Sequence, residues 1–129
     1  MQGTLDSIQR FFAAQPDVEL AYVFGSIAKE SAGADSDLDV AIQTRQPLSA
    51  EQRFDMVEAL AALTGRPVDL VDVAHAGEPL LGEILAHGKR IKGTDNHHVR
   101  LVQRHIYDTE DFLPTIRRLI EARRQQWIS

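Results

Sequence analysis

The side chains best suited to chemistry in this chain are two aspartates, Asp37 and Asp39, which stand two positions apart in an apolar segment. The segment reads Asp-Leu-Asp-Val-Ala-Ile, and this alternation predicts a strand with both carboxylates on one face. Leu38, Val40 and Ile42 are then expected to be buried on the other face. Two like charges so close on a strand repel each other and favour a bound cation. Oxygen ligands suit a hard ion such as Mg²⁺, which fills its other positions with waters and substrate phosphates.

A second element with phosphate-binding character precedes these aspartates, where Gly25 and Ser26 follow an apolar run. Residues 18–24 predict a buried strand. Gly25 allows close approach of the backbone, and Ser26 is expected to open a short helix whose first N–H groups attract anions. Phosphate at Gly25 and Ser26 and a metal ion at Asp37 and Asp39 would together form the site of a metal–nucleotide complex.

Gly-Ser followed about ten residues later by Asp-x-Asp resembles the signature of nucleotidyltransferases of the DNA polymerase beta superfamily. That family has a third carboxylate on a later strand, and Val-Asp-Leu-Val-Asp supplies Asp69 and Asp72 as candidates. Residues three apart on a strand face opposite sides, so only one of them can face the first pair, and the resemblance favours Asp69. Asp35 also stands two positions before Asp37. The family spacing selects Asp37 and Asp39, which leaves Asp35 as a turn residue.

The resemblance implies metal-dependent transfer of a nucleotidyl group from ATP. Asp37 and Asp39 are expected to bridge two Mg²⁺ ions held about 4 Å apart, with Asp69 completing the shell of the ion that activates the acceptor hydroxyl. The acceptor oxygen then attacks the α-phosphorus, and pyrophosphate leaves. Whether Asp69 itself accepts the proton stays open at this point.

Two basic residues lie near the proposed site in sequence, Lys29 and Arg66. Lys29 follows Ser26 by three residues, on the same helical turn, and is the candidate for binding phosphate. Minimal nucleotidyltransferases usually show Arg there, and lysine keeps the charge but loses the bidentate geometry. A solvated surface lysine is an equal alternative. Arg66 is expected to be structural or solvent-facing.

Length and charge narrow the class of acceptor. A chain of 129 residues with 43% hydrophobic residues can bury one core, which predicts a single domain over 1–129. The catalytic core is expected over about 18–95 and a helical partner-binding tail over about 96–129. No room is expected for a separate substrate-recognition domain. The formal net charge of −5 disfavours an extended nucleic acid substrate, because its phosphates need rows of Lys and Arg.

Several classes of site are disfavoured by composition. The chain has no cysteine, which excludes a disulfide framework, a thiol nucleophile and a cysteine-based zinc site. His97, His98 and His105 lack the spacing of a ligand set and are expected to be solvated or capping. No signal peptide or long apolar span is apparent, so a cytoplasmic protein without a membrane partner is expected.

The elements that must position these residues alternate between helix and strand. Their order predicts an α/β (α+β) mixed sheet flanked by helices. The resemblance implies the DNA polymerase beta-like nucleotidyltransferase fold with a C-terminal helical extension. A first helix is predicted to end before Pro16, and its buried positions are Leu5, Ile8, Phe11 and Phe12.

The most clearly marked helix follows Ser49, which forms a capping box with Gln52, and ends at Gly65, which provides a left-handed stop. This helix leads into the strand of the third carboxylate. Its apolar stripe is expected to be buried and consists of Phe54, Val57, Leu60, Ala61 and Leu63.

The last third of the chain predicts another helix, an edge strand and a helical tail. The helix is expected between Gly77 and about Gly88, and the edge strand over residues 89–92. Pro114 should kink or divide the tail helix. Folding back on the sheet and docking on another protein are equal interpretations of its apolar stripe. The stripe consists of Val102, Ile106, Thr109, Leu113, Ile116, Ile120 and Trp127.

Minimal nucleotidyltransferases (MNT proteins) of this size resemble the antitoxins of HEPN–MNT toxin–antitoxin pairs, a type VII-like system. The resemblance covers about residues 18–95 and implies transfer of AMP from ATP to a tyrosine of a HEPN ribonuclease toxin, which neutralises the toxin. Docking of that partner would supply the proximity that a recognition domain supplies elsewhere. Two alternatives stay open. One is a small-molecule nucleotidyltransferase, for example one acting on an aminoglycoside, and the other is a non-catalytic antitoxin that occludes the toxin.

Overall fold

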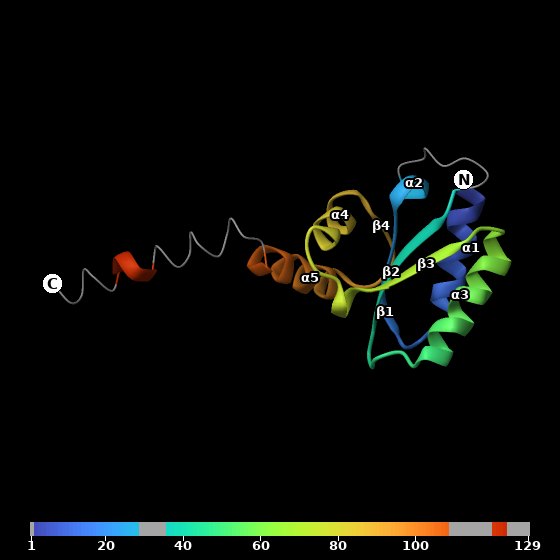
Figure 1. Cartoon of the computed structure of the whole chain (residues 1–129), viewed down its shortest axis with the longest axis horizontal. Coiled ribbons are helices and arrows are strands. Elements are labelled where there is room, and N and C mark those ends of the chain that lie inside the picture. Colours follow the sequence, from blue (N-terminus) through green and yellow to red (C-terminus); the bar gives the residue numbers. More distant parts are fainter. Residues whose placement is uncertain (1, 29–35, 109–119, 124–129) are drawn as a thin grey trace.

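The computed structural model describes residues 2–28, 36–108 and 120–123 of the chain (Figure 1). Within them a four-stranded sheet has α1 and α3 on one face and α4 and α5 on the other. The elements are α1 (Gln2–Ala13), β1 (Val18–Phe24), α2 (Gly25–Ala28), β2 (Leu38–Thr44), α3 (Ala50–Thr64), β3 (Val68–Asp72), the 3₁₀ turn η1 (Val73–His75), α4 (Leu80–His87), β4 (Lys89–Lys92) and α5 (Asp95–Asp108).

The strand order β3-β2-β1-β4 and the strand directions determine which residues meet at each end of the strands. β1 is antiparallel to both β2 and β4, whereas β2 and β3 are parallel. The last residues of β1 therefore lie at the same end of the sheet as the first residues of β2, β3 and β4. The predicted mixed sheet and the edge position of β4 are confirmed.

Each face of the sheet has its own apolar core. Leu38, Val40 and Ile42 of β2 are at most 1% exposed and pack on the side of α1 and α3, as the alternation predicts. The intervening Ala41 packs on the opposite side with residues of α4 and α5. The strand thus buries apolar side chains on both faces, and Asp39 lies on the face of Ala41.

The ends of α3 form as predicted, but its buried stripe differs. The Ser49 hydroxyl accepts from the Gln52 backbone N–H, Gln52 in turn accepts from the Ser49 N–H, and Gly65 ends the helix with a φ of 68°. Of the expected stripe, Leu60 is buried. Phe54 was predicted to be buried and is 66% exposed, which is a correction.

The side of α3 that faces the sheet is centred on Met56 and Leu60, which are four residues apart and therefore stacked on one face. Phe54 lies two positions before Met56, about half a turn away, and points to solvent. Leu63 was also predicted to be buried and is 47% exposed, and it lines a surface hollow together with Phe11 of α1. The predicted stripe was therefore right at Val57 and Leu60, in its middle, and wrong at Phe54 and Leu63, at its two ends.

The helix α5 is attached to the sheet mostly by polar contacts, and its one buried side chain is Leu101. Ile106 of the predicted tail stripe is 38% exposed and Ile120 is 55% exposed. The interpretation in which the stripe folds back on this chain's own sheet is therefore not met at these two positions. The remaining tail residues that were singled out, Thr109, Leu113, Pro114, Ile116 and Trp127, lie outside the described residues.

The three histidines of the C-terminal region hold α5 in place, which corrects the expectation that they are solvated or capping. His97 Nε2 lies 2.5 Å from a Glu19 carboxylate oxygen. The Tyr22 hydroxyl and His98 Nδ1 are 2.6 Å apart. His105 Nδ1 likewise lies 2.5 Å from a carboxylate oxygen of Glu78. No helix among the described residues has the length and apolar character needed to cross a membrane.

Candidate functional site

Asp39 and Asp69 lie side by side where β2 and β3 begin. Asp39 is the register partner of Asp69 in the parallel pair and of Phe24, the last residue of β1, in the antiparallel pair. Residues paired across neighbouring strands point to the same face of a sheet. The carboxylates of Asp39 and Asp69 are therefore neighbours on the face that also carries Phe24.

Asp37 lies immediately before β2 and is exposed, whereas Asp39 is half-buried. Burial raises the pKa of the Asp39 carboxyl, and the negative charges of Asp69 and Asp37 raise it further. The three carboxylates thus interact electrostatically, as the sequence predicts for Asp37 and Asp39. A cation bound among them would relieve this repulsion.

Gly25 connects the Gly-Ser element to the carboxylates. Its φ of 71° lies in the left-handed region, which L side chains rarely adopt. A Cβ atom at Gly25 would also collide with the Asp39 carboxylate. The backbone at the start of α2 therefore packs directly against Asp39, and only glycine satisfies both the conformation and the space.

Ser26 is the second residue of α2 and is partly exposed. The next two residues, Ile27 and Ala28, are buried and anchor the short helix in the core on the side of α1 and α3. The structure thus places Ser26 one residue beyond the contact between Gly25 and Asp39. Lys29, the predicted phosphate ligand, lies outside the described residues, as does Asp35.

Asp72 is separated from this group, as the three-residue spacing on a strand predicts. It pairs in register with Ile42, whose side chain is buried on the opposite face. Its carboxylate accepts a hydrogen bond of 3.0 Å from the Ala74 backbone N–H and caps the turn η1. The structure brings Asp69 beside Asp39 and gives Asp72 a local structural contact.

The carboxylates at this end of the sheet are chemically suited to bind Mg²⁺. Asp37, Asp39 and Asp69 offer hard oxygen donors, and Mg²⁺ is usually held by one or two carboxylates together with waters and substrate phosphates. Within the described residues, no group of three or more His, Asp or Glu side chains has the geometry to hold a metal ion. Waters and, when a nucleotide is bound, its phosphates would supply the remaining ligands of an ion held by these carboxylates.

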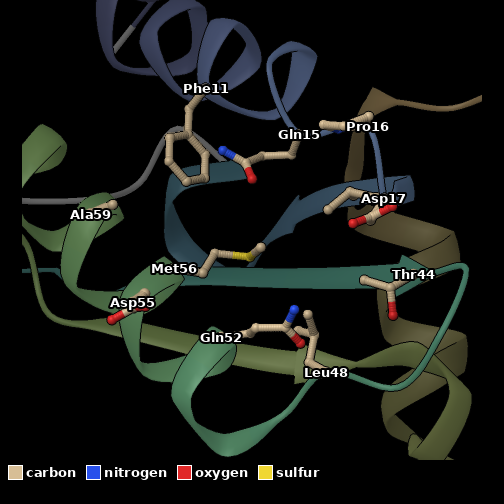
Figure 2. A pocket seen from close by; sticks show the side chains of 11 residues that line it. Phe11, Gln15, Pro16, Asp17, Thr44, Leu48, Gln52, Asp55, Met56 and Ala59 are labelled. Atoms are coloured by element: carbon tan, nitrogen blue, oxygen red, sulfur yellow. The ribbon is translucent and has the colours of Figure 1, made fainter.

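A cavity of about 280 Å³ lies elsewhere in the molecule, between the end of α1 and the start of α3 (Figure 2). Thr44 lines it at one end of β2, whereas Asp39 lies near the other end of the strand. The residues that line the cavity include the apolar Phe11 and Met56 and the acidic Asp17 and Asp55. The cavity is therefore distinct from the carboxylate site.

One basic residue at the same end of the sheet as the carboxylates was not weighed as a site residue in the sequence analysis. Lys89 opens β4 and pairs with Val23, next to the last residue of β1. The sequence analysis weighed only basic residues close to the motifs along the chain. Pairing between β1 and β4 joins distant segments, and no local pattern signals it.

Residues 6–97 match the family model of the Polymerase beta, Nucleotidyltransferase domain. The chain belongs to this nucleotidyltransferase family. The family match and the mixed α/β architecture confirm the predicted fold class and the predicted resemblance.

Among relatives, the protein adenylyltransferase MntA of Shewanella oneidensis is 32% identical over 79 residues, which are 61% of this chain and 57% of that protein. The match therefore spans little more than half the length of the relative. Similar solved structures include a toxin–antitoxin with AMP-PNP, with a TM-score of 0.71, 25% identity and coverage of 96% of this chain and 94% of that chain. A second is a tri-AMPylated Shewanella oneidensis HEPN toxin in complex with an MNT antitoxin, with a TM-score of 0.67, 24% identity and coverage of 98% and 94%. At that identity, the second likeness shows the fold alone.

Proposed function

We propose that this chain is the antitoxin of a HEPN–MNT toxin–antitoxin pair and acts as a protein adenylyltransferase that transfers AMP from ATP to a tyrosine of a HEPN ribonuclease toxin. The observation that carries the proposal is the placement of Asp39 between Asp69 and the Gly25 backbone. The relative with the name protein adenylyltransferase supports the type of acceptor. The similar toxin–antitoxin structure with AMP-PNP supports ATP as the nucleotide and a toxin as the partner. The complex of an AMPylated HEPN toxin with an MNT antitoxin shares the fold and gives the class of toxin that we propose.

In this proposal Asp37, Asp39 and Asp69 hold Mg²⁺, and Gly25 and Ser26 hold the triphosphate. When bound, Mg²⁺ would neutralise phosphate charge and lower the pKa of the acceptor hydroxyl. Asp39 is fixed by strand pairing on both sides, so its carboxylate is presented without rearrangement of the backbone. Gly25 keeps the backbone at the start of α2 close to that carboxylate, where a Cβ atom would collide with Asp39.

The transfer itself is a displacement at the α-phosphorus. The tyrosine oxygen forms a bond to this phosphorus and gives up its proton to water. The bond from the phosphorus to the bridging oxygen breaks, and pyrophosphate leaves with the electron pair. The acceptor tyrosine is presented by the docked partner, so this chain needs only to hold the nucleotide in line with it.

The docking surface in this proposal is the helical tail, from about residue 96 onward. α5 exposes Val99 by 50%, Ile106 by 38% and Tyr107 by 57%. Val99 and Ile106 are seven residues apart and therefore lie on the same side of the helix. These apolar side chains favour docking on the partner over folding back on this chain's own sheet.

The proposal is tested by co-expression of the chain with the product of the gene adjacent to its own, which the proposal expects to be the HEPN toxin. The wild-type chain should restore growth, and Asp39→Asn should fail to restore it while still forming the complex. Asp72→Asn serves as the matched control, because Asp72 is an aspartate on the same strand as Asp69 but on the opposite face. If Asp39→Asn neutralises the toxin as well as wild type does, the chain acts by occlusion and the proposed transfer is wrong.

A further inference from the structure

Arg66 lies just before β3 and reaches across to the segment that leads into β2. Its Nη1 donates a hydrogen bond of 2.9 Å to the carbonyl oxygen of Ser36, thirty positions earlier in the chain. Both the side chain of Arg66 and this contact are partly buried. Ser36 immediately precedes Asp37, so the arginine holds the backbone directly next to the first carboxylate of the site.

A second bond ties the other side of Asp37 to the same stretch of chain. The backbone N–H of Leu38 donates a hydrogen bond of 2.8 Å to the carbonyl oxygen of Pro67. Ser36 and Leu38 flank Asp37, and Arg66 and Pro67 precede the strand that carries Asp69. The two bonds therefore fix the position of Asp37 relative to β3 from both sides.

Asp37 has more need of such support than Asp39. Asp39 lies within β2 and is held by register pairing with β1 and with β3. Asp37 precedes the first residue of the strand and is exposed. A guanidinium that donates to a carbonyl forms a charge-assisted hydrogen bond, which is stronger than a neutral one. Without it, the residue before Asp37 loses its bond to Arg66, whereas Leu38 stays paired with Val68 in the ladder of β2 and β3.

We propose that Arg66 is a positioning residue, which holds the backbone before Asp37 against the start of β3 and so sets the separation of the carboxylates for a divalent cation. The proposal rests on the proposed function, because it concerns the same three carboxylates. Arg66 touches neither the metal ion nor the nucleotide in this role. Removal of a residue that orients a metal ligand without contacting the metal typically weakens metal affinity by about 10–100-fold.

The test measures binding of Mn²⁺ alone, as a spin probe for the Mg²⁺ site, by electron paramagnetic resonance of the free ion. Arg66→Ala is expected to weaken Mn²⁺ binding by about tenfold. Arg66→Lys should recover much of the loss, because lysine retains a charged donor. Thermal unfolding of each variant is recorded in parallel, so that a change in metal affinity can be separated from loss of folded protein.

Arg104→Ala is the matched control. Arg104 also donates from its guanidinium to backbone carbonyl oxygens, those of Val73 at 2.7 Å and Ala76 at 3.0 Å, and it is equally partly buried. These carbonyls lie beyond the end of β3 that is remote from Asp69. Arg104→Ala should therefore lower the melting temperature and leave Mn²⁺ affinity unchanged.

Three results would overturn the positioning role. Mn²⁺ affinity of Arg66→Ala equal to wild type would show that the arginine only stabilises the fold. An equal loss of affinity in Arg104→Ala would show a general effect of destabilisation. If the wild-type chain neither binds Mn²⁺ nor transfers AMP, the proposed function and the positioning role are refuted together. If the wild-type chain transfers AMP and the Mn²⁺ affinity of Arg66→Ala is unaltered, the positioning role alone is refuted. If Arg66→Ala does not fold, Arg66→Met, which keeps an unbranched side chain but has no N–H donor, replaces it under the same criteria.

Discussion

Asp39 is the register partner of Asp69 in the parallel pair of β2 and β3. The backbone of Gly25, directly after β1, packs against the Asp39 carboxylate. Three segments that are distant in sequence thus converge on one side chain. The arrangement explains why burial and two neighbouring negative charges raise the pKa of Asp39. Carboxylates that repel one another in the folded protein form a candidate site for a cation.

Asp39→Asn is expected to abolish AMP transfer while increasing the stability of the metal-free protein. The substitution removes the repulsion with Asp37 and Asp69 and keeps the shape of the side chain. The measurements are a transfer assay and thermal unfolding without Mg²⁺. A melting temperature clearly below that of wild type would contradict the electrostatic account of the site.

Asp72→Asn is expected to leave transfer intact, because Asp72 faces away from Asp39. Its carboxylate caps the turn η1 through the Ala74 N–H, and an asparagine oxygen can accept the same bond. Asp72→Ala removes the cap and should lower the free energy of unfolding by about 1 kcal/mol. Loss of transfer in Asp72→Asn, measured under the same conditions, would show that the wrong carboxylate on β3 has been assigned.

The stability of the metal-free protein should depend on pH through Asp39. Its folded-state pKa lies above the usual value near 3.8, so the folded protein holds this proton more tightly than the unfolded chain does. The stabilising contribution is full below the usual value and is lost as pH rises through the raised folded value. Urea unfolding of wild type and Asp39→Asn across this interval should show a fall that is specific to wild type. Saturating Mg²⁺ should reduce that fall, because a bound ion stabilises the ionised carboxylates.

Gly25→Ala and Gly65→Ala separate backbone strain from collision at the site. Both glycines have positive φ angles, 71° and 68°, and alanine in this conformation costs about 1–2 kcal/mol. Around Gly65 there is open space, whereas a Cβ at Gly25 collides with the Asp39 carboxylate. Both variants should lose stability, but only Gly25→Ala should lose transfer, by more than about tenfold, which corresponds to 1.4 kcal/mol. Unchanged transfer in Gly25→Ala would show that the close approach is irrelevant to the reaction.

The corrected orientation of α3 is tested by Met56→Ala and Phe54→Ala. Met56 is 9% exposed, and its truncation should lower the free energy of unfolding by about 2–3 kcal/mol. Phe54 is 66% exposed, and its truncation should change stability by less than about 0.5 kcal/mol. Chemical denaturation of both variants gives the comparison. A larger loss for Phe54→Ala would restore the stripe predicted from sequence.

The elements with strong local signals were predictable from the sequence. Alternation placed Leu38, Val40 and Ile42 in the core, and the Ser49 capping box and the Gly65 stop marked the ends of α3. These features depend on residues within a few positions of each other. The choice of Asp69 over Asp72 needed the family resemblance, because spacing alone says only that the two face opposite sides.

The features that were missed depend on contacts between distant segments. Tyr22 and His98 are 76 positions apart, and no local pattern indicates that a histidine in a polar stretch meets a buried tyrosine. The bond from Arg66 to Ser36 likewise joins the starts of two strands that become neighbours only in the folded sheet. On α3, apolar residues occupy more than one side of the helix, so periodicity alone did not determine which side meets the sheet.

The central claim is tested most directly by incubating the purified chain with Mg²⁺, ATP and the product of the gene adjacent to its own, which the account expects to be the HEPN toxin. The intact masses of both proteins are then measured. The account predicts that the HEPN protein gains mass in whole AMP units, that Asp39→Asn abolishes the gain, and that Asp72→Asn retains it. A HEPN protein of unchanged mass in a stable complex with the wild-type chain would contradict the account.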